Sequence, residues 1–140
     1  MPSSLKPKEP LKVILDSNSL FAQLELKIDI FEEVKRLLNR NIEFVLLSPV
    51  KNELELLAAK DSPKIRREAA YALKLSEKCN CVAVENSEKL STDDVIIKVS
   101  KAWNSIVFTN DRQLRKRLKD ISVPVIYVRQ KSRLDIDGLT

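Results

Sequence analysis

Four acidic residues stand where their carboxylates could act together: Asp16, Glu53, Asp93 and Asp111. Each lies directly after an apolar run or near the start of a stretch with helical periodicity. Close like charges cost free energy unless a cation neutralises them. Carboxylate oxygens are also the ligands that Mg²⁺ and Mn²⁺ prefer in proteins. If the fold brings these residues together, they predict a metal site.

Residue types that are missing or rare exclude several kinds of catalytic and binding site. The 140 residues include no histidine, which excludes histidine acid–base catalysis and mixed histidine–cysteine zinc sites. The single glycine, Gly138, excludes glycine-rich phosphate loops and therefore a nucleotide cofactor held by one. Cys79 and Cys81 are expected to be buried or half-buried thiols on one face of a strand. The net charge of +5 suits a metal site that meets a polyanion.

Short apolar runs alternate with amphipathic stretches, and this alternation must position the acids. Strands are predicted at residues 11–15, 43–47, 81–84, 105–109 and 123–128. Helices are predicted at residues 19–26, 28–39, 50–60, 64–78, 95–103 and 112–119. Alternating helices and continuously apolar strands are typical of a parallel sheet covered on both faces. The fold class is therefore α/β, a three-layer α/β/α sandwich with a parallel sheet of about five strands.

This topology would bring the acids to one edge of the sheet. Asp16 follows the first strand and Asp111 the fourth, and parallel strands end at the same edge. Glu53 lies in the first turns of the helix after the second strand, and Asp93 lies with Asp94 at the start of the helix before the fourth. The alternative is that the aspartates only cap helices or turns and that Glu53 is solvated.

The length of the chain fits one domain. Residues 1–10 are predicted to be a disordered lead, residues 11–129 the folded domain, and residues 130–140 a flexible tail. No apolar run approaches the ~20 residues of a membrane span, and the start has no apolar core of a secretory signal. We therefore expect no membrane association and a cytoplasmic location.

Four stretches resemble the motifs of PIN-domain ribonucleases. They are residues 13–18 (VILDSN), 48–55 (SPVKNELE), 92–96 (TDDVI) and 109–114 (TNDRQL). Residues 27–33 and 123–129 are similar to the archaeal branch related to the Fcf-type rRNA-processing nucleases, of which VapC toxins are relatives. The one departure is Ser17, where threonine is commoner in the family.

The resemblance implies a sheet order of 3-2-1-4-5 and a metal-dependent endoribonuclease that hydrolyses RNA phosphodiester bonds. It gives the catalytic and metal-binding positions to Asp16, Glu53, Asp93 and Asp111, with Asp94 as an additional ligand. One or two Mg²⁺ or Mn²⁺ ions would be bound there. Supporting positions fall on Ser17, Asn18, Thr109 and Asn110.

The same resemblance leaves the pathway open between rRNA processing or RNA turnover and a VapC-type toxin. Partners would then be RNA with ribosome-assembly factors or an antitoxin protein, and related domains often form homodimers. The rival function is a catalytically inactive RNA-binding PIN module in a ribosome-assembly or RNA-decay complex. A phosphate-transfer fold of the haloacid-dehalogenase type is disfavoured because it needs a second aspartate at position 18, which is Asn18.

Basic residues near the predicted site form a candidate RNA surface. Four of them share one face of the helix at 112–119, at i, i+3, i+4 and i+7 spacing: Arg112, Arg115, Lys116 and Lys119. Arg129, after the last predicted strand, is a further candidate. The alternative for each of these residues is an ordinary solvated surface.

Overall fold

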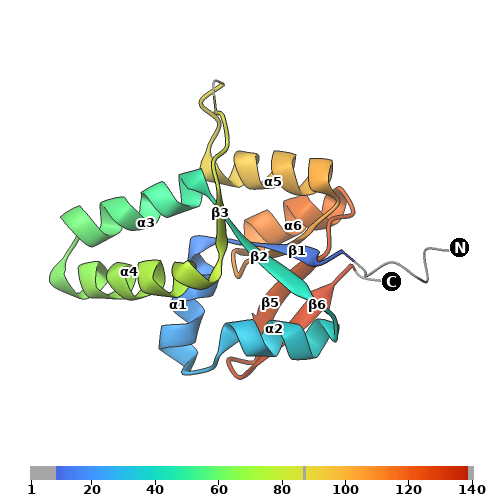
Figure 1. Ribbon diagram of the computed structural model, residues 1–140, viewed down its shortest axis with the longest axis horizontal. Coiled ribbons are helices and arrows are strands. Elements are labelled where there is room, and N and C mark those ends of the chain that lie inside the picture. Colours follow the sequence, from blue (N-terminus) through green and yellow to red (C-terminus); the bar gives the residue numbers. More distant parts are fainter. Residues whose placement is uncertain (1–8, 87, 139–140) are drawn as a thin grey trace, which may run out of the picture.

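A computed structural model describes residues 9–86 and 88–138 (Figure 1). Most of the predicted disordered lead, residues 1–8, lies outside the described residues. The strands are β1 (Leu11–Leu15), β2 (Ile42–Leu47), β3 (Asn80–Val82), β4 (Ile106–Phe108), β5 (Val125–Arg129) and β6 (Arg133–Asp137). The helices are α1 (Ser17–Leu26), α2 (Ile30–Leu38), α3 (Ser48–Lys60), α4 (Pro63–Leu75), α5 (Thr92–Trp103) and α6 (Arg112–Asp120), and the 3₁₀ turn η2 (Ser76–Lys78) follows α4.

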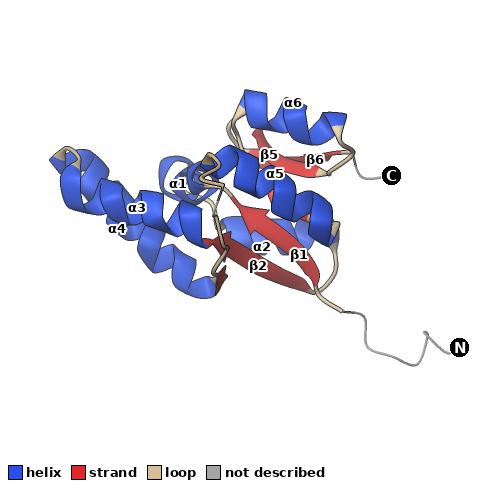
Figure 2. Cartoon of the chain, turned by 90° about the horizontal axis from the view of Figure 1, so that it is seen from above, coloured by secondary structure: helices blue, strands red, loops and turns tan. Residues whose placement is uncertain are grey.

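The described strands form one sheet in the order β3-β2-β1-β4-β5-β6. The first five strands are parallel, and β1 is hydrogen-bonded to both β2 and β4. Helices α5 and α6 lie on one side of the sheet and α2 lies on the other (Figure 2). The predicted three-layer α/β/α sandwich and its strand order are therefore confirmed.

A sixth strand extends the predicted sheet. Strand β6 pairs antiparallel with β5, within the stretch for which the sequence predicts a flexible tail. Residues 133–137 alternate charged and apolar side chains, which suits a strand with one buried face. Leu134 is 8% exposed, and Ile136 packs on the core beside it. The tail prediction is therefore wrong for residues 133–137.

The core consists of the strands and the inner faces of the helices. Strand residues Val13, Ile14 and Leu15 are fully buried, because β1 lies in the middle of the sheet and is covered on both faces. Helices α3 and α4 pack along one another and project beyond the sheet (Figure 1). In the described part of the chain, no helix combines the length and the apolarity that crossing a membrane requires.

Two local details differ from what the sequence suggests. A Ser-Pro pair such as Ser48-Pro49 is typical of a helix start with serine as the cap, but Leu47 occupies the N-cap position of α3 and the Ser48 hydroxyl accepts a hydrogen bond of 2.9 Å from the Val84 N–H. This bond ties the start of α3 to the segment after β3. Cys79 is half-buried, as expected, whereas Cys81 is exposed because β3 is an edge strand.

Candidate active site

Asp16 is the buried acid at the carboxyl end of the central strand β1. Its side chain is only 6% exposed. One carboxylate oxygen, Oδ1, accepts the backbone N–H of Ser17 at 2.8 Å, which caps α1. The other, Oδ2, accepts the Thr109 hydroxyl at 2.8 Å and the Asn18 amide at 3.2 Å. The carboxylate is therefore held in one orientation by three donors.

Thr109 joins the ends of β1 and β4. It is fully buried, and its hydroxyl donates to Asp16 while accepting the backbone N–H of Asp111 at 3.1 Å. The side-chain oxygen of Asn18 accepts the backbone N–H of Asn110 at 3.0 Å. These side chains fix the loop that carries Asp111 against the loop that carries Asp16, although more than ninety residues separate them along the chain.

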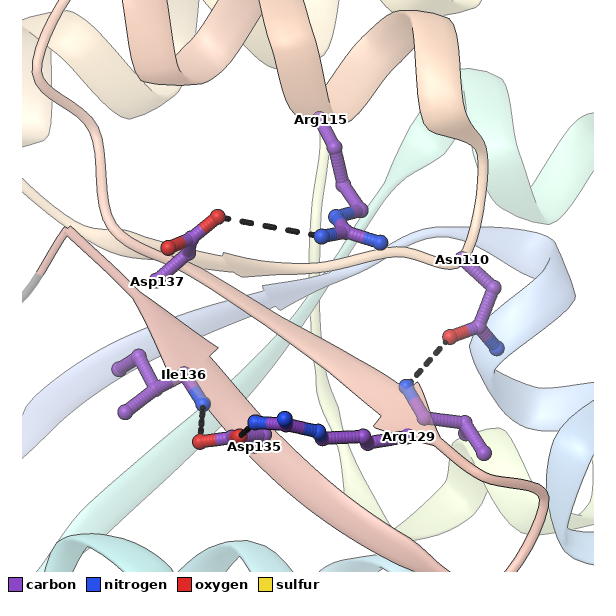
Figure 3. Close-up of polar contacts among 7 residues, drawn as sticks. Asn110, Arg115, Arg129, Asp135, Ile136 and Asp137 are labelled. Carbon is purple, nitrogen blue, oxygen red and sulfur yellow. Dashed lines mark hydrogen bonds and ion pairs between the residues drawn. The ribbon is translucent and has the colours of Figure 1, made fainter.

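Asn110 and Asp111 extend this network to β5 and α6. The side-chain oxygen of Asn110 accepts the backbone N–H of Val128 at 2.8 Å (Figure 3). Asp111 is the N-cap of α6, where its Oδ1 accepts the N–H groups of Gln113 and Leu114. The capping interpretation of Asp111 is thus correct, and it is compatible with a place beside Asp16.

Glu53 and Asp93 approach from α3 and α5. The Thr92 hydroxyl donates to the Glu53 carboxylate at 3.1 Å and connects these two helices. Ser91, not Asp93, caps α5, because its hydroxyl accepts the Asp94 N–H at 3.2 Å. Asp93 therefore stands in the first turn of α5 and is not its N-cap.

The four acids influence one another electrostatically. Burial raises the pKa of Asp16, and the charge of Asp111 raises it further against the lowering effect of its hydrogen bonds. Partial desolvation raises the pKa of Glu53 although its side chain is open to solvent, and the charges of Asp16 and Asp93 add to this effect. Desolvation and the charges of Asp16 and Asp111 also raise the pKa of Asp93. Asp16 is therefore close enough to each of Glu53, Asp93 and Asp111 for their charges to interact.

The Asp94 carboxylate is paired with a residue of α6. Its carboxylate accepts a hydrogen bond of 2.6 Å from Arg117 of α6, and this bond lowers the pKa of Asp94. A rotation of about 100° per helical residue separates neighbouring side chains, so Asp93 and Asp94 leave α5 in different directions. The charge of Asp94 also raises the pKa of Asp93, but its carboxylate is bonded to Arg117 rather than to the network around Asp16.

The residues present fit a hard divalent cation. All donors of the group are carboxylate oxygens, supported by hydroxyl and amide groups, which is the chemistry that Mg²⁺ and Mn²⁺ select. In residues 9–86 and 88–138, no three such side chains approach closely enough to hold one ion jointly. Neighbouring carboxylates also repel one another. Burial, and to a lesser extent this repulsion, raises the pKa values of Asp16, Glu53 and Asp93.

The predicted basic surface is present on α6, which starts at the acidic group. Arg112, Lys116 and Lys119 are exposed, whereas Arg115 is half-buried with its guanidinium 3.7 Å from the centre of the Tyr127 ring. Arg129, on β5, forms an ion pair of 2.8 Å with Asp135 on β6. Both arginines therefore have partners on the β5–β6 hairpin.

Sequence reasoning missed several contributors to this region. Thr92 was not singled out, because nothing local reveals that it reaches a helix 39 residues earlier. The acids of β6 were missed together with the strand itself.

Comparisons with known proteins agree with this geometry. Residues 13–131 match the family described as PIN like domain. The chain is 33% identical over 128 residues to Ribonuclease VapC4 of Methanocaldococcus jannaschii, covering 91% of this chain and 98% of that protein. It is 27% identical over 126 residues to Ribonuclease VapC9 of Archaeoglobus fulgidus, covering 90% of this chain and 89% of that protein.

A solved structure has the same fold. The PIN domain endonuclease Utp24 superposes with a TM-score of 0.78, covering 94% of each chain at 24% identity. The family match runs from the middle of β1 to the turn after β5. Together with the relatives named as ribonucleases, these likenesses show that the chain belongs to the PIN-domain ribonuclease family.

Proposed function

We propose that this protein is a metal-dependent endoribonuclease that hydrolyses phosphodiester bonds of RNA. The observation that carries the proposal is the buried Asp16 carboxylate, which three hydrogen bonds orient beside the charges of three other acids. Burying an acid that is repelled by its neighbours costs stability. Such a cost is typical of functional sites. We assign the activity to residues 11–129, with β6 as an extension of the same sheet.

The residues that would hold Mg²⁺ or Mn²⁺ are Asp16, Glu53, Asp93 and Asp111. When bound, such an ion supplies Lewis-acid activation of the phosphodiester and of a water molecule. Thr109 keeps the Asp16 carboxylate in place, and the capping bonds of Asp111 use only one of its oxygens. Glu53 is open to solvent, and the Thr92 hydroxyl donates to its carboxylate.

RNA is the proposed substrate for two reasons. The relatives with curated names are ribonucleases. In addition, α6 begins at the acidic group and carries the basic residues Arg112, Lys116 and Lys119 on its exposed surface. Cationic side chains beside a catalytic acid group would bind the phosphates that flank the scissile bond.

For the cellular role we favour a VapC-type ribonuclease, because both curated relatives carry that name. The corresponding partner is an antitoxin protein that restrains the activity. Inducible expression in a host cell tests this role. Growth arrest by the wild type, absent for Asp16→Asn and relieved by the product of an adjacent gene, would support it. Unrestricted growth with active enzyme would favour an RNA-processing role.

Incubation of purified protein with single-stranded and structured RNAs tests the activity itself. We expect cleavage with Mn²⁺ or Mg²⁺, none with EDTA, and none for Asp16→Asn. Asp61→Asn, in the exposed turn between α3 and α4, is the matched control and should cut like the wild type. RNA binding without cleavage under every metal condition would instead support the inactive RNA-binding module.

A further inference from the structure

A basic cleft lies between α6 and β6. It has a volume of about 460 Å³ and is lined by Arg112, Arg115, Lys116, Lys119 and Asp137. The four cations come from one face of α6, whose N-cap is Asp111 of the acidic group. At about 1.5 Å per residue, the basic face extends roughly 10 Å from the site along α6.

Arg115 is the cation that is held most firmly in this cleft. Its guanidinium lies over the Tyr127 ring of β5, 3.7 Å from the ring centre. The same guanidinium is 3.8 Å from the Asp137 carboxylate of β6 (Figure 3). Its side chain is only 29% exposed. An arginine that is oriented in advance loses little freedom when a phosphate accepts its paired N–H groups.

Strand β6 places two carboxylates beside the arginines of this region. Asp135 is opposite Tyr127 in the antiparallel register and Asp137 is opposite Val125, so both share the sheet face of the Tyr127 ring. Asp135 pairs with Arg129 at 2.8 Å, and Asp137 pairs with Arg115 (Figure 3). Asp135 thus takes up a guanidinium that a phosphate would otherwise bind, and Asp137 neutralises the charge of another at longer range.

We propose that the α6–β6 cleft binds the RNA backbone next to the acidic site and that Asp137 and Asp135 compete with its phosphates for Arg115 and Arg129. This inference rests on the proposed function and adds to it a path for the RNA and a limit on its affinity. Ion pairs that are partly open to solvent contribute little stability, so a phosphate can replace each carboxylate. The protein then holds RNA less tightly than its positive charge alone would allow.

The positive charge of the α6–β6 cleft favours an RNA strand as the molecule that binds there. Four cations face a single acid in the cleft, and the spacing along one helix face suits successive phosphates of a strand that passes the site. Apolar anchors, which a folded protein partner would need, are not among the lining residues of the cleft.

The experiment is RNA binding in EDTA, which separates binding from cleavage. A short fluorescein-labelled single-stranded RNA is titrated by anisotropy over a series of KCl concentrations. Asp137→Asn should bind about two- to fivefold more tightly than the wild type, since it removes a competing ion pair. Arg115→Ala should bind about tenfold more weakly, and the slope of log affinity against log salt should fall by about 0.7. Asp135→Asn should act in the same direction as Asp137→Asn.

Two matched controls separate the cleft from net charge. Asp61→Asn removes one negative charge and Arg67→Ala one positive charge at exposed positions of the α3–α4 hairpin. Both should stay within about twofold of the wild type. If Asp61→Asn tightens binding as much as Asp137→Asn, net charge explains the gain and the inference is overturned. Weaker binding by a normally folded Asp137→Asn would also overturn it.

Cleavage with Mn²⁺ is scored separately in the same variants. If the wild type cuts RNA and Arg115→Ala binds and cuts equally well, the cleft is not the RNA path, while the proposed function stands. If the binding shifts occur without any cleavage, the inference stands and the proposed hydrolysis fails. A response of these variants to an acidic peptide, with none to RNA, would overturn RNA as the occupant.

Discussion

Replacing Asp16 by asparagine should separate the two roles of this residue through stability alone. The folded protein raises the pKa of Asp16, mainly by burial, so the charged form is less favourable in the folded protein than in the unfolded chain. Near neutral pH, Asp16→Asn removes that unfavourable charge. It also weakens the contacts at Oδ2, because an amide nitrogen would face the Asn18 amide.

The two effects oppose each other and can be compared in size. Loss of one or two hydrogen bonds costs about 1–2 kcal/mol, and relief of a buried and repelled charge offsets a cost of similar size. We therefore expect the metal-free variant to melt within about 4 °C of the wild type. If Asp16 were only a structural cap and its charge had no electrostatic cost, Asp16→Asn would instead lower the stability by the full contribution of the lost hydrogen bonds, about 1–2 kcal/mol.

Added metal should then raise the melting temperature of the wild type more than that of Asp16→Asn. A ligand at a hundredfold excess over its Kd stabilises the folded state by about 2.7 kcal/mol, which corresponds to roughly 10 °C in a domain of this size. Thermal melts with EDTA and with millimolar Mn²⁺ should show this gain for the wild type and for the control Asp61→Asn, and little of it for Asp16→Asn. Equal gains in all three proteins, with Asp16→Asn melting far lower in EDTA, would refute the metal site at its central residue.

Three further predictions concern the same network. Thr109→Val leaves the Asp111 N–H without its acceptor and Asp16 without a donor, so it should lower stability by about 1–3 kcal/mol in urea unfolding, and Thr109→Ser should restore most of it. Because folding raises the pKa of Asp16, its contribution makes stability fall as pH rises from its ordinary value of 3.8 to its raised value; that decline should be shallower in Asp16→Asn melts across the same range. A double-mutant cycle between Asp94 and Arg117 should give a coupling below about 1 kcal/mol, because both side chains are solvent-exposed; a much larger value would contradict a surface ion pair.

The strands at the centre of the sheet could be predicted because each is a continuous apolar run. Val13, Ile14 and Leu15 are buried on both faces, so their sequence carries the full signal of a central parallel strand. Parallel topology then places Asp16 and Asp111 at one edge. The part of the site that lies at the strand ends, Asp16 and Asp111, could therefore be predicted from the sequence.

The remainder depends on pairings that no local pattern encodes. Strand β6 looks like a polar tail because its outward positions are charged, and only Leu134 and Ile136 pack on the core. Asp94 is adjacent to Asp93 in sequence, yet the helical rotation carries it to Arg117. The contact of Thr92 with Glu53 requires the packing of α5 beside α3, which emerges only from the tertiary structure.

The most direct test of the account is the rate of RNA cleavage at saturating Mn²⁺ for single variants of the acids. Asp16→Asn, Glu53→Gln, Asp93→Asn and Asp111→Asn should each lose about a hundredfold or more, since even residues that only support metal ligands are worth 10- to 100-fold. Asp94→Asn should retain activity within a few-fold, because its carboxylate faces Arg117. Full activity of Asp16→Asn, or a loss in Asp94→Asn as large as in Asp93→Asn, would contradict the assignment of the site.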